Sequence, residues 1–311
     1  MPVIDGHSVT VTHPDKILFP DDGITKGELV DYYERIADRM LPFVRNRPLH
    51  MNRFPDGIKG IAIQQKRIPD SAPKWVERTT VEKVGGTVTH AMINNAATLV
   101  YLANYNMITA HIWLSQVKAI HQPDQMVFDL DPADENFTLV RETALKLKAL
   151  LADEYALNAV VKTTGSRGLH VIVPITVGPH FEEVHLFADY IAQRLAADDP
   201  EHLTTEFIKA DRRGRLFLDV NRNAYAQTIV AAYAVRAKAG APVAVPVSWK
   251  EVERDDLTPN GVTIRTIFEW LRRHPDPWAN LDESRRPLPS LPESQRPDRS
   301  GRRRGVKKQP G

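Results

Sequence analysis

The segment Met-Val-Phe-Asp-Leu-Asp-Pro at 126–132 constrains this chain more than any other stretch. It predicts a short buried strand carrying Asp129 and Asp131, ended by Pro132 because proline cannot donate to a β-ladder. Side chains at positions i and i+2 of a strand share a face, so the two carboxylates stand side by side. Like charges this close are costly unless a cation neutralises them, usually a divalent metal ion. The alternative is a solvent-facing strand end with two hydrated carboxylates.

A third acidic residue, Asp219, lies on a second apolar strand predicted over 216–220. Three carboxylates can hold two Mg²⁺ or Mn²⁺ ions, which is the arrangement that phosphoryl transfer to a hydroxyl requires. One ion lowers the pKa of the attacking 3′-hydroxyl, and the other holds the triphosphate and the leaving pyrophosphate. Taken alone, Asp219 fits a strand-end aspartate bonded to a backbone amide. Together with Asp129 and Asp131, it favours a catalytic metal site.

Groups that suit phosphate flank these strands. The segment 163–170 contains a short glycine-bearing turn whose Thr164 and Ser166 hydroxyls, arginine and backbone amides are available to phosphate oxygens. His170 opens the next strand, and His111 precedes the acidic pair; taken singly, each fits a core or surface position better than a ligand. Five arginines flank the third aspartate and suit either a bound polyphosphate or a solvated face: Arg212, Arg213, Arg215, Arg222 and Arg236.

The remaining periodicity predicts an α+β fold with mixed strand order. A capping box formed by Thr25 and Glu28 predicts the start of the first helix. Further strands are predicted over 6–11, 48–54, 60–66, 87–93, 109–117, 157–163, 169–174 and 228–235. Further helices are predicted over 96–105, 137–152, 181–196 and 203–209.

The chain has no cysteine, which excludes a disulfide framework and a thiolate zinc site and favours a reducing cytoplasm. It has no run of 18 apolar residues and no signal-peptide pattern, so we expect an intracellular protein without a membrane segment. The net charge is +2, yet residues 285–311 contain nine basic and two acidic residues. We expect one catalytic region over 1–284 and a disordered basic tail over 285–311, which either contacts nucleic acid or is merely solvated.

The order of the motifs resembles the polymerase domain of bacterial DNA ligase D, a branch of the archaeo-eukaryotic primase superfamily. The similarity covers nearly all of residues 3–280. The matching pieces are Asp15-Lys16 with Thr25-Lys26, Asn46-Arg47-Pro48-Leu49, Ala110-His111-Ile112, Phe128-Asp129-Leu130-Asp131-Pro132, Lys162-Thr163-Thr164-Gly165-Ser166-Arg167-Gly168-Leu169-His170, Leu218-Asp219-Val220-Asn221 and Thr228-Ile229-Val230-Ala231-Ala232-Tyr233-Ala234-Val235-Arg236.

The resemblance implies a primase-polymerase catalytic core, in which an RRM-like mixed sheet packs with a second small α/β subdomain. It implies a two-metal, template-directed nucleotidyltransferase that fills short gaps or broken ends in DNA repair, such as non-homologous end joining, often with ribonucleotides and Mn²⁺. The implied partners are gapped or broken duplex DNA with a 5′-phosphate, rNTPs or dNTPs, a separate ATP-dependent DNA ligase and Ku. The implied location is the cytoplasm, at the nucleoid.

Carried over residue by residue, the resemblance assigns three sets of residues. Asp129, Asp131 and Asp219 bind the two Mn²⁺ or Mg²⁺ ions. Lys16 and Lys26 bind the 5′-phosphate of the downstream strand, a contact that orients the gap without reading sequence. The residues assigned to the incoming nucleotide are His111, Arg53, Thr164, Ser166, His170, Arg212, Arg222 and Arg236.

Some positions depart from the family's pattern. Asn52 stands where the family often has a lysine for the triphosphate, and the neighbouring Arg53 is the expected substitute. Thr164 replaces a serine but keeps a hydroxyl, and His13 stands where an asparagine is expected. The tip at 62–64 lacks the paired phenylalanines with which family members stack on and splay the template. Since stacking typically contributes about 1–3 kcal/mol per base, template handling is expected to differ here.

Two other functions use some of the same features. A non-catalytic gap- or end-binding scaffold is disfavoured by the intact set of Asp129, Asp131 and Asp219. A metal-dependent phosphatase or nuclease also uses three carboxylates, but it does not explain the paired Lys16 and Lys26. Since no ligase or nuclease domain follows, we expect a stand-alone polymerase.

Overall fold

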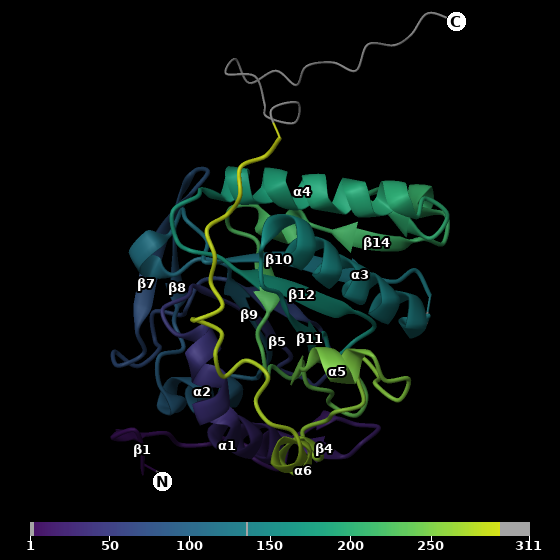
Figure 1. Cartoon of the computed structure of the whole chain (residues 1–311). Helices are drawn as coiled ribbons and strands as arrows, with labels where there is room; N and C mark the ends of the chain where they lie inside the picture. The colour runs from purple at the N-terminus through teal and green to yellow at the C-terminus, as the bar shows by residue number, and fades with distance from the viewer. Residues whose placement is uncertain (1–2, 135, 293–311) are drawn as a thin grey trace, which may run out of the picture.

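The computed structural model describes residues 3–134 and 136–292, and its two large sheets confirm the expected α+β architecture (Figure 1). In the larger sheet, all neighbouring strands are antiparallel except β13 and β14. Its six strands, in spatial order, are β13 (Leu203–Thr204), β14 (Leu216–Asp219), β10 (Gln125–Asp131), β12 (Leu169–Pro174), β11 (Val160–Thr163) and β16 (Pro246–Val247).

The second sheet is antiparallel, and its four strands in spatial order are β15 (Thr228–Val230), β9 (Met107–Trp113), β5 (Leu49–Arg53) and β6 (Ile63–Gln65). Three short hairpins complete the strands: β1 (Val3–Ile4) with β2 (His7–Ser8), β3 (Ile17–Phe19) with β4 (Ile24–Thr25), and β7 (Arg78–Lys83) with β8 (Gly86–Ala91). The α-helices are α1 (Lys26–Val44), α2 (Ala96–Asn104), α3 (Phe137–Tyr155), α4 (Phe181–Asp198), α5 (Trp249–Val252) and α6 (Ile267–Arg273). None of these helices is long and apolar enough to cross a membrane.

The alternation of side chains along β10 assigns one face of the six-stranded sheet to the core and the other to the site. Phe128 and Leu130 pack in a cluster with the apolar residues of α3 and α4. Val127 points to the opposite face and packs in the other cluster, together with residues of the four-stranded sheet and of α1 and α2. Because the period of a strand is two, Asp129 and Asp131 share the face of Val127. The D-x-D strand therefore exists as predicted, and its carboxylates face away from α3 and α4.

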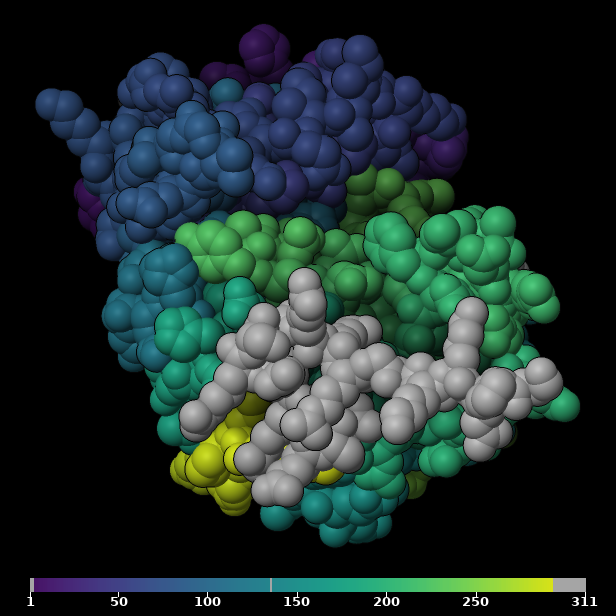
Figure 2. All heavy atoms as spheres, turned by 90° about the horizontal axis from the view of Figure 1, so that it is seen from above, coloured from purple at the N-terminus to yellow at the C-terminus, as the bar shows by residue number. Residues whose placement is uncertain are grey.

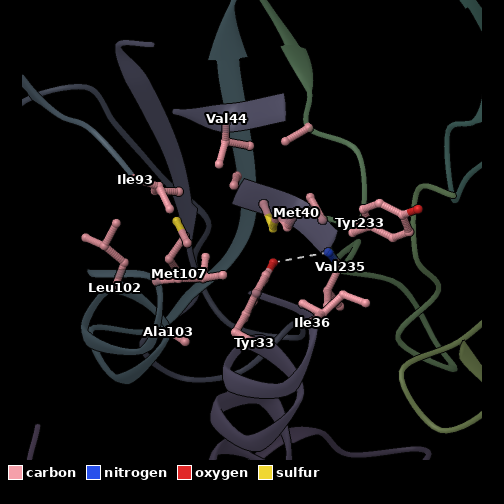
Figure 3. Packing of buried hydrophobic residues seen from close by; sticks show 14 of the residues in the cluster. Tyr33, Ile36, Met40, Val44, Ile93, Leu102, Ala103, Met107, Tyr233 and Val235 are labelled. Atoms are coloured by element: carbon pink, nitrogen blue, oxygen red, sulfur yellow. Dashed lines mark hydrogen bonds between the residues drawn. The ribbon is translucent and has the colours of Figure 1, made fainter. Parts of the chain in front are cut away.

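Helix α1 joins the four-stranded sheet to the rest of the chain. It begins at the predicted capping box, in which Thr25 and Glu28 satisfy each other's backbone amides. Its fully buried Tyr33 donates to the carbonyl of Ile108 at 2.6 Å, which ties α1 to β9. The same hydroxyl accepts from the amide of Val235 at 3.1 Å, which ties α1 to the segment after β15 (Figure 3). Figure 2 shows that the N-terminal residues, purple to blue, gather on one side of the molecule.

The structure differs from the sequence predictions at three short segments. The helix predicted over 203–209 is absent; strand β13 lies there instead, because Leu203 pairs with Leu216 of β14 in register. The strand predicted over 228–235 ends at Val230, and Tyr233 adopts a left-handed backbone (φ 64°) that a strand cannot continue through. In 6–11, only His7 and Ser8 are paired.

The disorder predicted from residue 285 onward does not hold for residues 285–292. The amide of Arg286 donates to Pro174, and its carbonyl accepts from Thr176 at 2.9 Å, which extends the edge of β12. Leu288 and Leu291 pack against the cluster of α3 and α4. Partial burial of these apolar side chains stabilises a segment whose composition alone suggested disorder. Residues 293–311 lie outside the described part of the chain.

Candidate active site

Four polar side chains form one row across the six-stranded sheet. Asp219 of β14 pairs with Asp129 of β10, Asp129 pairs with His170 of β12, and His170 pairs with Lys162 of β11. Directly opposed residues of neighbouring strands share a face, with Cβ atoms typically about 4.5–5.5 Å apart. The row lies on the face turned toward the four-stranded sheet, and Asp131 extends it two residues further along β10. Strand pairing thus brings Asp219 beside Asp129 and Asp131, although it lies far from them in the sequence.

Asp129 and Asp219 share one arginine. The Arg222 Nε lies 4.0 Å from the Asp129 Oδ2 and 3.6 Å from the Asp219 Oδ2. The His170 Nε2 lies 3.4 Å from the Asp129 Oδ1. The Asp219 Oδ1 accepts from the backbone amide and the side-chain amide of Asn221, both at 2.9 Å. These contacts hold both carboxylates in fixed orientations.

Asp131 is half-buried and bound by two arginines. The Arg167 Nη2 lies 2.9 Å from one carboxylate oxygen, and the Arg212 Nη1 lies 3.4 Å from the other. Among the described residues, no three histidine, aspartate or glutamate side chains converge closely enough to hold a metal ion as they stand. The arginines account for this, because each carboxylate is turned toward a guanidinium. The oxygen ligands and the negative charge of Asp129, Asp131 and Asp219 nevertheless fit a hard divalent cation, which would replace the charge that the arginines now provide.

The ionisation of the row follows from burial and its neighbours. Burial raises the pKa of Asp219, and the nearby charge of Asp129 raises it further. Burial also opposes ionisation of Asp129, but His170, Arg222 and Lys162 outweigh it and hold the pKa of that carboxyl below its usual value. Burial lowers the pKa of His170 to about 4, so its ring is neutral at pH 7. Two adjacent carboxylates, one of them harder to ionise, favour a bound cation.

A cavity of about 250 Å³ opens beside the row, and we call it the histidine cavity. Several buried polar atoms in its wall have no hydrogen-bond partner, namely His50 Nε2, Asn52 Oδ1, His111 Nδ1 and His170 Nδ1. Buried polar atoms without partners are costly, so these four atoms favour a polar ligand in the cavity. The charged residues that line the cavity are Asp129, Arg222 and Arg236.

The glycine-bearing turn positions Arg236 at this cavity. The Arg236 Nη1 donates to the carbonyl of Thr164 at 2.6 Å, and a side chain at Gly165 (φ +62°) would collide with the Arg236 Cγ at 2.7 Å. The Thr164 hydroxyl bonds to Gly168 across the turn. Ser166 points elsewhere, since its hydroxyl bonds to Lys238 at 2.6 Å and does not line the cavity. In this structure Thr164 shapes the turn, and neither Thr164 nor Ser166 lines the histidine cavity.

Arg53, the expected substitute for the lysine that Asn52 replaces, does not line the histidine cavity. Consecutive residues of β5 point to opposite faces, so Asn52 lines the histidine cavity and Arg53 lines a separate one. There, Arg53 donates to the carbonyl of Tyr105 at 2.8 Å and to Gln65 at 2.7 Å, and its guanidinium lies 3.4 Å from the centre of the Tyr105 ring. The structure therefore places Arg53 outside the histidine cavity, on the opposite face of β5 from Asn52.

That separate cavity, of about 360 Å³, brings Lys16 and Lys26 together, and we call it the lysine cavity. The Lys26 Nζ donates to the Thr12 hydroxyl at 3.0 Å, and the Lys16 Nζ lies 3.3 Å from Asp56. Burial lowers the pKa of Lys26, and the charge of Lys16 lowers it further. With Arg53, three cationic groups line one pocket, which suits a phosphate.

Sequence reasoning missed two residues of the site, His50 and Lys162. His50 pairs with His111 across β5 and β9, with ring centroids 6.2 Å apart. Lys162 is fully buried, and its Nζ has no hydrogen-bond partner. Burial, followed by the charge of Arg236, lowers the pKa of Lys162 to about 7. The signal for Lys162 was a lysine inside the apolar run 160–163, but its position beside His170 depends on strand register.

Replacing Lys162 by methionine is expected to raise the melting temperature at pH 6, because it removes a buried, unpartnered charge. In the folded protein the Lys162 ammonium group loses its proton near pH 7, whereas in the unfolded chain it keeps the proton up to about pH 10.4. The unfolded state therefore binds more protons between these values, so the penalty is full below pH 7 and declines above it. Thermal melts at pH 6, 7.5 and 9 should show that the increase in melting temperature of Lys162→Met over wild type becomes smaller as the pH rises. Lys250→Met, at an exposed lysine, should show no such trend; a variant less stable than wild type at pH 6 contradicts this reasoning.

The sequence matches one protein family over most of its length. Residues 25–278 match the model described as LigD, primase-polymerase domain. The chain is 34% identical over 277 residues to the multifunctional non-homologous end joining protein LigD of Mycolicibacterium smegmatis, covering 88% of this chain and 36% of that protein. It is 30% identical over 272 residues to the bifunctional non-homologous end joining protein LigD of Bacillus subtilis, covering 87% of this chain and 43% of that protein.

The fold also matches a solved structure over most of the chain. The polymerase domain from Mycobacterium tuberculosis Ligase D, in complex with DNA, superimposes with a TM-score of 0.83 at 30% sequence identity. The match covers 89% of this chain and 98% of that domain. The chain thus spans less than half the length of the curated relatives but nearly all of a single solved polymerase domain.

Proposed function

The chain belongs to the LigD primase-polymerase domain family, as the order of its motifs predicted, and on this premise we propose that it adds nucleotides to DNA ends and short gaps under the direction of a template. The observation that carries the proposal is the carboxylate row of Asp129, Asp131 and Asp219 beside the histidine cavity. A carboxylate row alone also suits a phosphatase. The unpartnered imidazoles and the arginines next to it favour a nucleoside triphosphate as the ligand.

In this proposal, Asp129, Asp131 and Asp219 hold two Mn²⁺ or Mg²⁺ ions. Bound divalent cations supply activation of the primer 3′-hydroxyl and neutralisation of charge on the leaving pyrophosphate. Arg222 and Arg236 orient the triphosphate, and the neutral rings of His50 and His111 bond to it within the histidine cavity. Because these two rings are neutral, they would donate directional hydrogen bonds to the triphosphate without adding positive charge to the cavity. The product is a nick with a 3′-hydroxyl and a 5′-phosphate, which a DNA ligase seals.

We extend the proposal to ribonucleotides as favoured substrates and to Ku-bound ends at the nucleoid as the place of action, since the motif resemblance implies both. The test is primer extension on a gapped duplex with a 5′-phosphate, with Mn²⁺ or Mg²⁺ and with rNTPs or dNTPs. We expect extension by the nucleotide complementary to the template, faster with rNTPs. Binding of the gap without extension under either metal would overturn the proposal and favour a non-catalytic end-binding scaffold.

The lysine cavity is proposed to bind the downstream 5′-phosphate through Lys16 and Lys26, with Arg53 as a third cationic group. Lys16→Ala combined with Lys26→Ala is expected to remove the preference for a 5′-phosphorylated gap over a 5′-hydroxyl gap, a loss on the order of tenfold or more in relative affinity. Fluorescence anisotropy on the two DNAs measures this preference. Lys118→Ala, at an exposed lysine outside the cavity, should leave it unchanged. An unaltered preference in the double variant places the phosphate elsewhere.

A further inference from the structure

One aromatic side chain stands apart from all others in the protein. The chain has 10 phenylalanines, 5 tryptophans and 8 tyrosines, all within the described residues, and only Phe207 is exposed. Its exposed fraction is 70%, and that of the neighbouring Ile208 is 61%. Burying a phenylalanine typically stabilises a protein by about 1.5–3 kcal/mol. Stability therefore gives no reason for this ring to face solvent.

The loop over 205–214 holds Phe207 at the edge of the carboxylate row. The Arg212 side chain donates to the carbonyls of Glu206 at 3.1 Å and Phe207 at 3.0 Å, and the same guanidinium lies 3.4 Å from the Asp131 Oδ2. It also lies 3.9 Å from the centre of the buried Phe217 ring. One guanidinium thus links the backbone of Phe207 to a proposed metal ligand. The exposed ring has a fixed place next to the site of chemistry.

The loop of Phe207 carries more cationic than anionic side chains. Lys209, Arg212 and Arg213 outnumber the two acidic residues, Glu206 and Asp211, and Lys209 and Arg213 are exposed. Proteins that bind single-stranded nucleic acid combine cations that follow the backbone with aromatic rings on which bases stack. An aliphatic protein partner would make no favourable contact with the cations. An unpaired nucleotide can stack its base on the ring and place its phosphate beside the cationic side chains.

We propose that Phe207 stacks on an unpaired base of the DNA substrate at the entrance to the active site. This inference rests on the proposed polymerase function and adds a residue that holds the single-stranded part of a gap. At the hairpin tip of β5 and β6, the exposed large hydrophobic side chains are Ile61 and Ile63, so the tip offers no aromatic ring for this purpose. Among the described residues, Phe207 is then the one exposed phenylalanine, tyrosine or tryptophan ring available to an unpaired base.

Stacking by Phe207 has a measurable consequence for binding. Phe207→Leu keeps an apolar side chain but removes the ring, and we expect it to weaken binding of a gapped duplex by about tenfold, within the range for one stacked base. Phe207→Trp should bind at least as tightly as wild type. Ile208→Ala, the matched control at the adjacent exposed position, should change the Kd by less than about twofold. Because these side chains are exposed, none of the changes should alter the fold, as circular dichroism can verify.

Photocrosslinking identifies the contact directly. A gapped duplex carrying 5-iodouracil at the unpaired template position is irradiated with the protein in the absence of nucleotide, and the attached peptide is mapped. We expect the crosslink at Phe207 and its loss in Phe207→Leu. A wild-type Kd for Phe207→Leu, or a crosslink that maps outside the 205–214 loop, overturns the proposal. Since no nucleotide is present, this result is independent of extension: a wild-type protein that crosslinks at Phe207 but never extends the primer overturns only the polymerase function.

Discussion

Replacing Asp129 by asparagine is expected to lower the rate of nucleotide addition on the order of 10³-fold or more while leaving the affinity for gapped DNA nearly unchanged. Asp129 lies at the centre of the row, opposite both His170 and Asp219, so it is the carboxylate best placed to contact both ions. Asparagine keeps the shape of the side chain and can still bond to His170, but it removes the charge. The loss should therefore fall on chemistry and metal binding, not on folding.

Single-turnover extension with saturating DNA and nucleotide measures the rate, and anisotropy measures DNA affinity. Asp153→Asn, at an exposed position of α3, is the control and should match wild type in both. If Asp129→Asn extends primers at a rate comparable to wild type, the row is not the catalytic metal site. If instead the variant loses DNA binding and its melting temperature falls, Asp129 has a structural role.

The second large effect concerns stability. Asp124→Ala is expected to destabilise the protein by about 3–5 kcal/mol, because it leaves the buried guanidinium of Arg47 without a counter-charge. The Asp124 Oδ2 accepts from the Arg47 Nη2 at 2.7 Å and from the Gln116 side chain at 3.0 Å, and Arg285 lies 3.5 Å away. Both partners of the Arg47–Asp124 pair are almost completely buried. The pair joins the loop before β5 to the residue before β10, so it connects the two sheets.

Urea denaturation should report this loss as a lower midpoint with an unchanged slope. Asp70→Ala removes an exposed ion pair with Arg67 and should cost less than about 1 kcal/mol. Replacing both members, with Arg47→Met and Asp124→Leu, should recover part of the loss, since a buried pair exchanged for apolar side chains is often neutral. If Asp124→Ala alone is as stable as wild type, the Arg47–Asp124 pair does not stabilise the fold.

The same pair has a defined pH dependence. Burial opposes ionisation of Asp124, but Arg47 and then Arg285 outweigh it, so the pKa of this carboxyl lies below its usual value. A depressed pKa in the folded state contributes stability above the unfolded value of about 3.9. That contribution is lost as the pH falls through the folded pKa, and the gap between wild type and Asp124→Ala should narrow in acid.

The sequence predicted the strands of the candidate site correctly, because there the chemistry of the residues agrees with the local periodicity. Alternation along 126–132 placed Asp129 and Asp131 on one face, and the apolar flanks of Asp219 indicated a second apolar strand. The order of motifs then identified the family. The capping box at Thr25 was also confirmed, because both of its hydrogen bonds are local.

The failures share a physical cause, which is dependence on contacts between distant segments. Lys162 belongs to the site only through register with His170, and no local pattern encodes that register. Residues 203–209 were assigned to a helix, but pairing with β14 overrides the propensity of so short a run. The position of Arg53, in contrast, follows from local alternation along β5, which places it on the face opposite Asn52. The segment 285–292 is ordered by apolar packing against the body of the protein, which composition does not reveal.

The central claim is that Asp129, Asp131 and Asp219 together hold two divalent cations, and it is tested most directly by counting bound Mn²⁺ with electron paramagnetic resonance. The titration uses the full chain with gapped DNA and a non-hydrolysable nucleoside triphosphate. Wild type is expected to bind two Mn²⁺ ions per chain, and Asp129→Asn to lose at least one of them. An equal number of bound ions in wild type and in Asp129→Asn, or no bound Mn²⁺ in wild type, contradicts the claim.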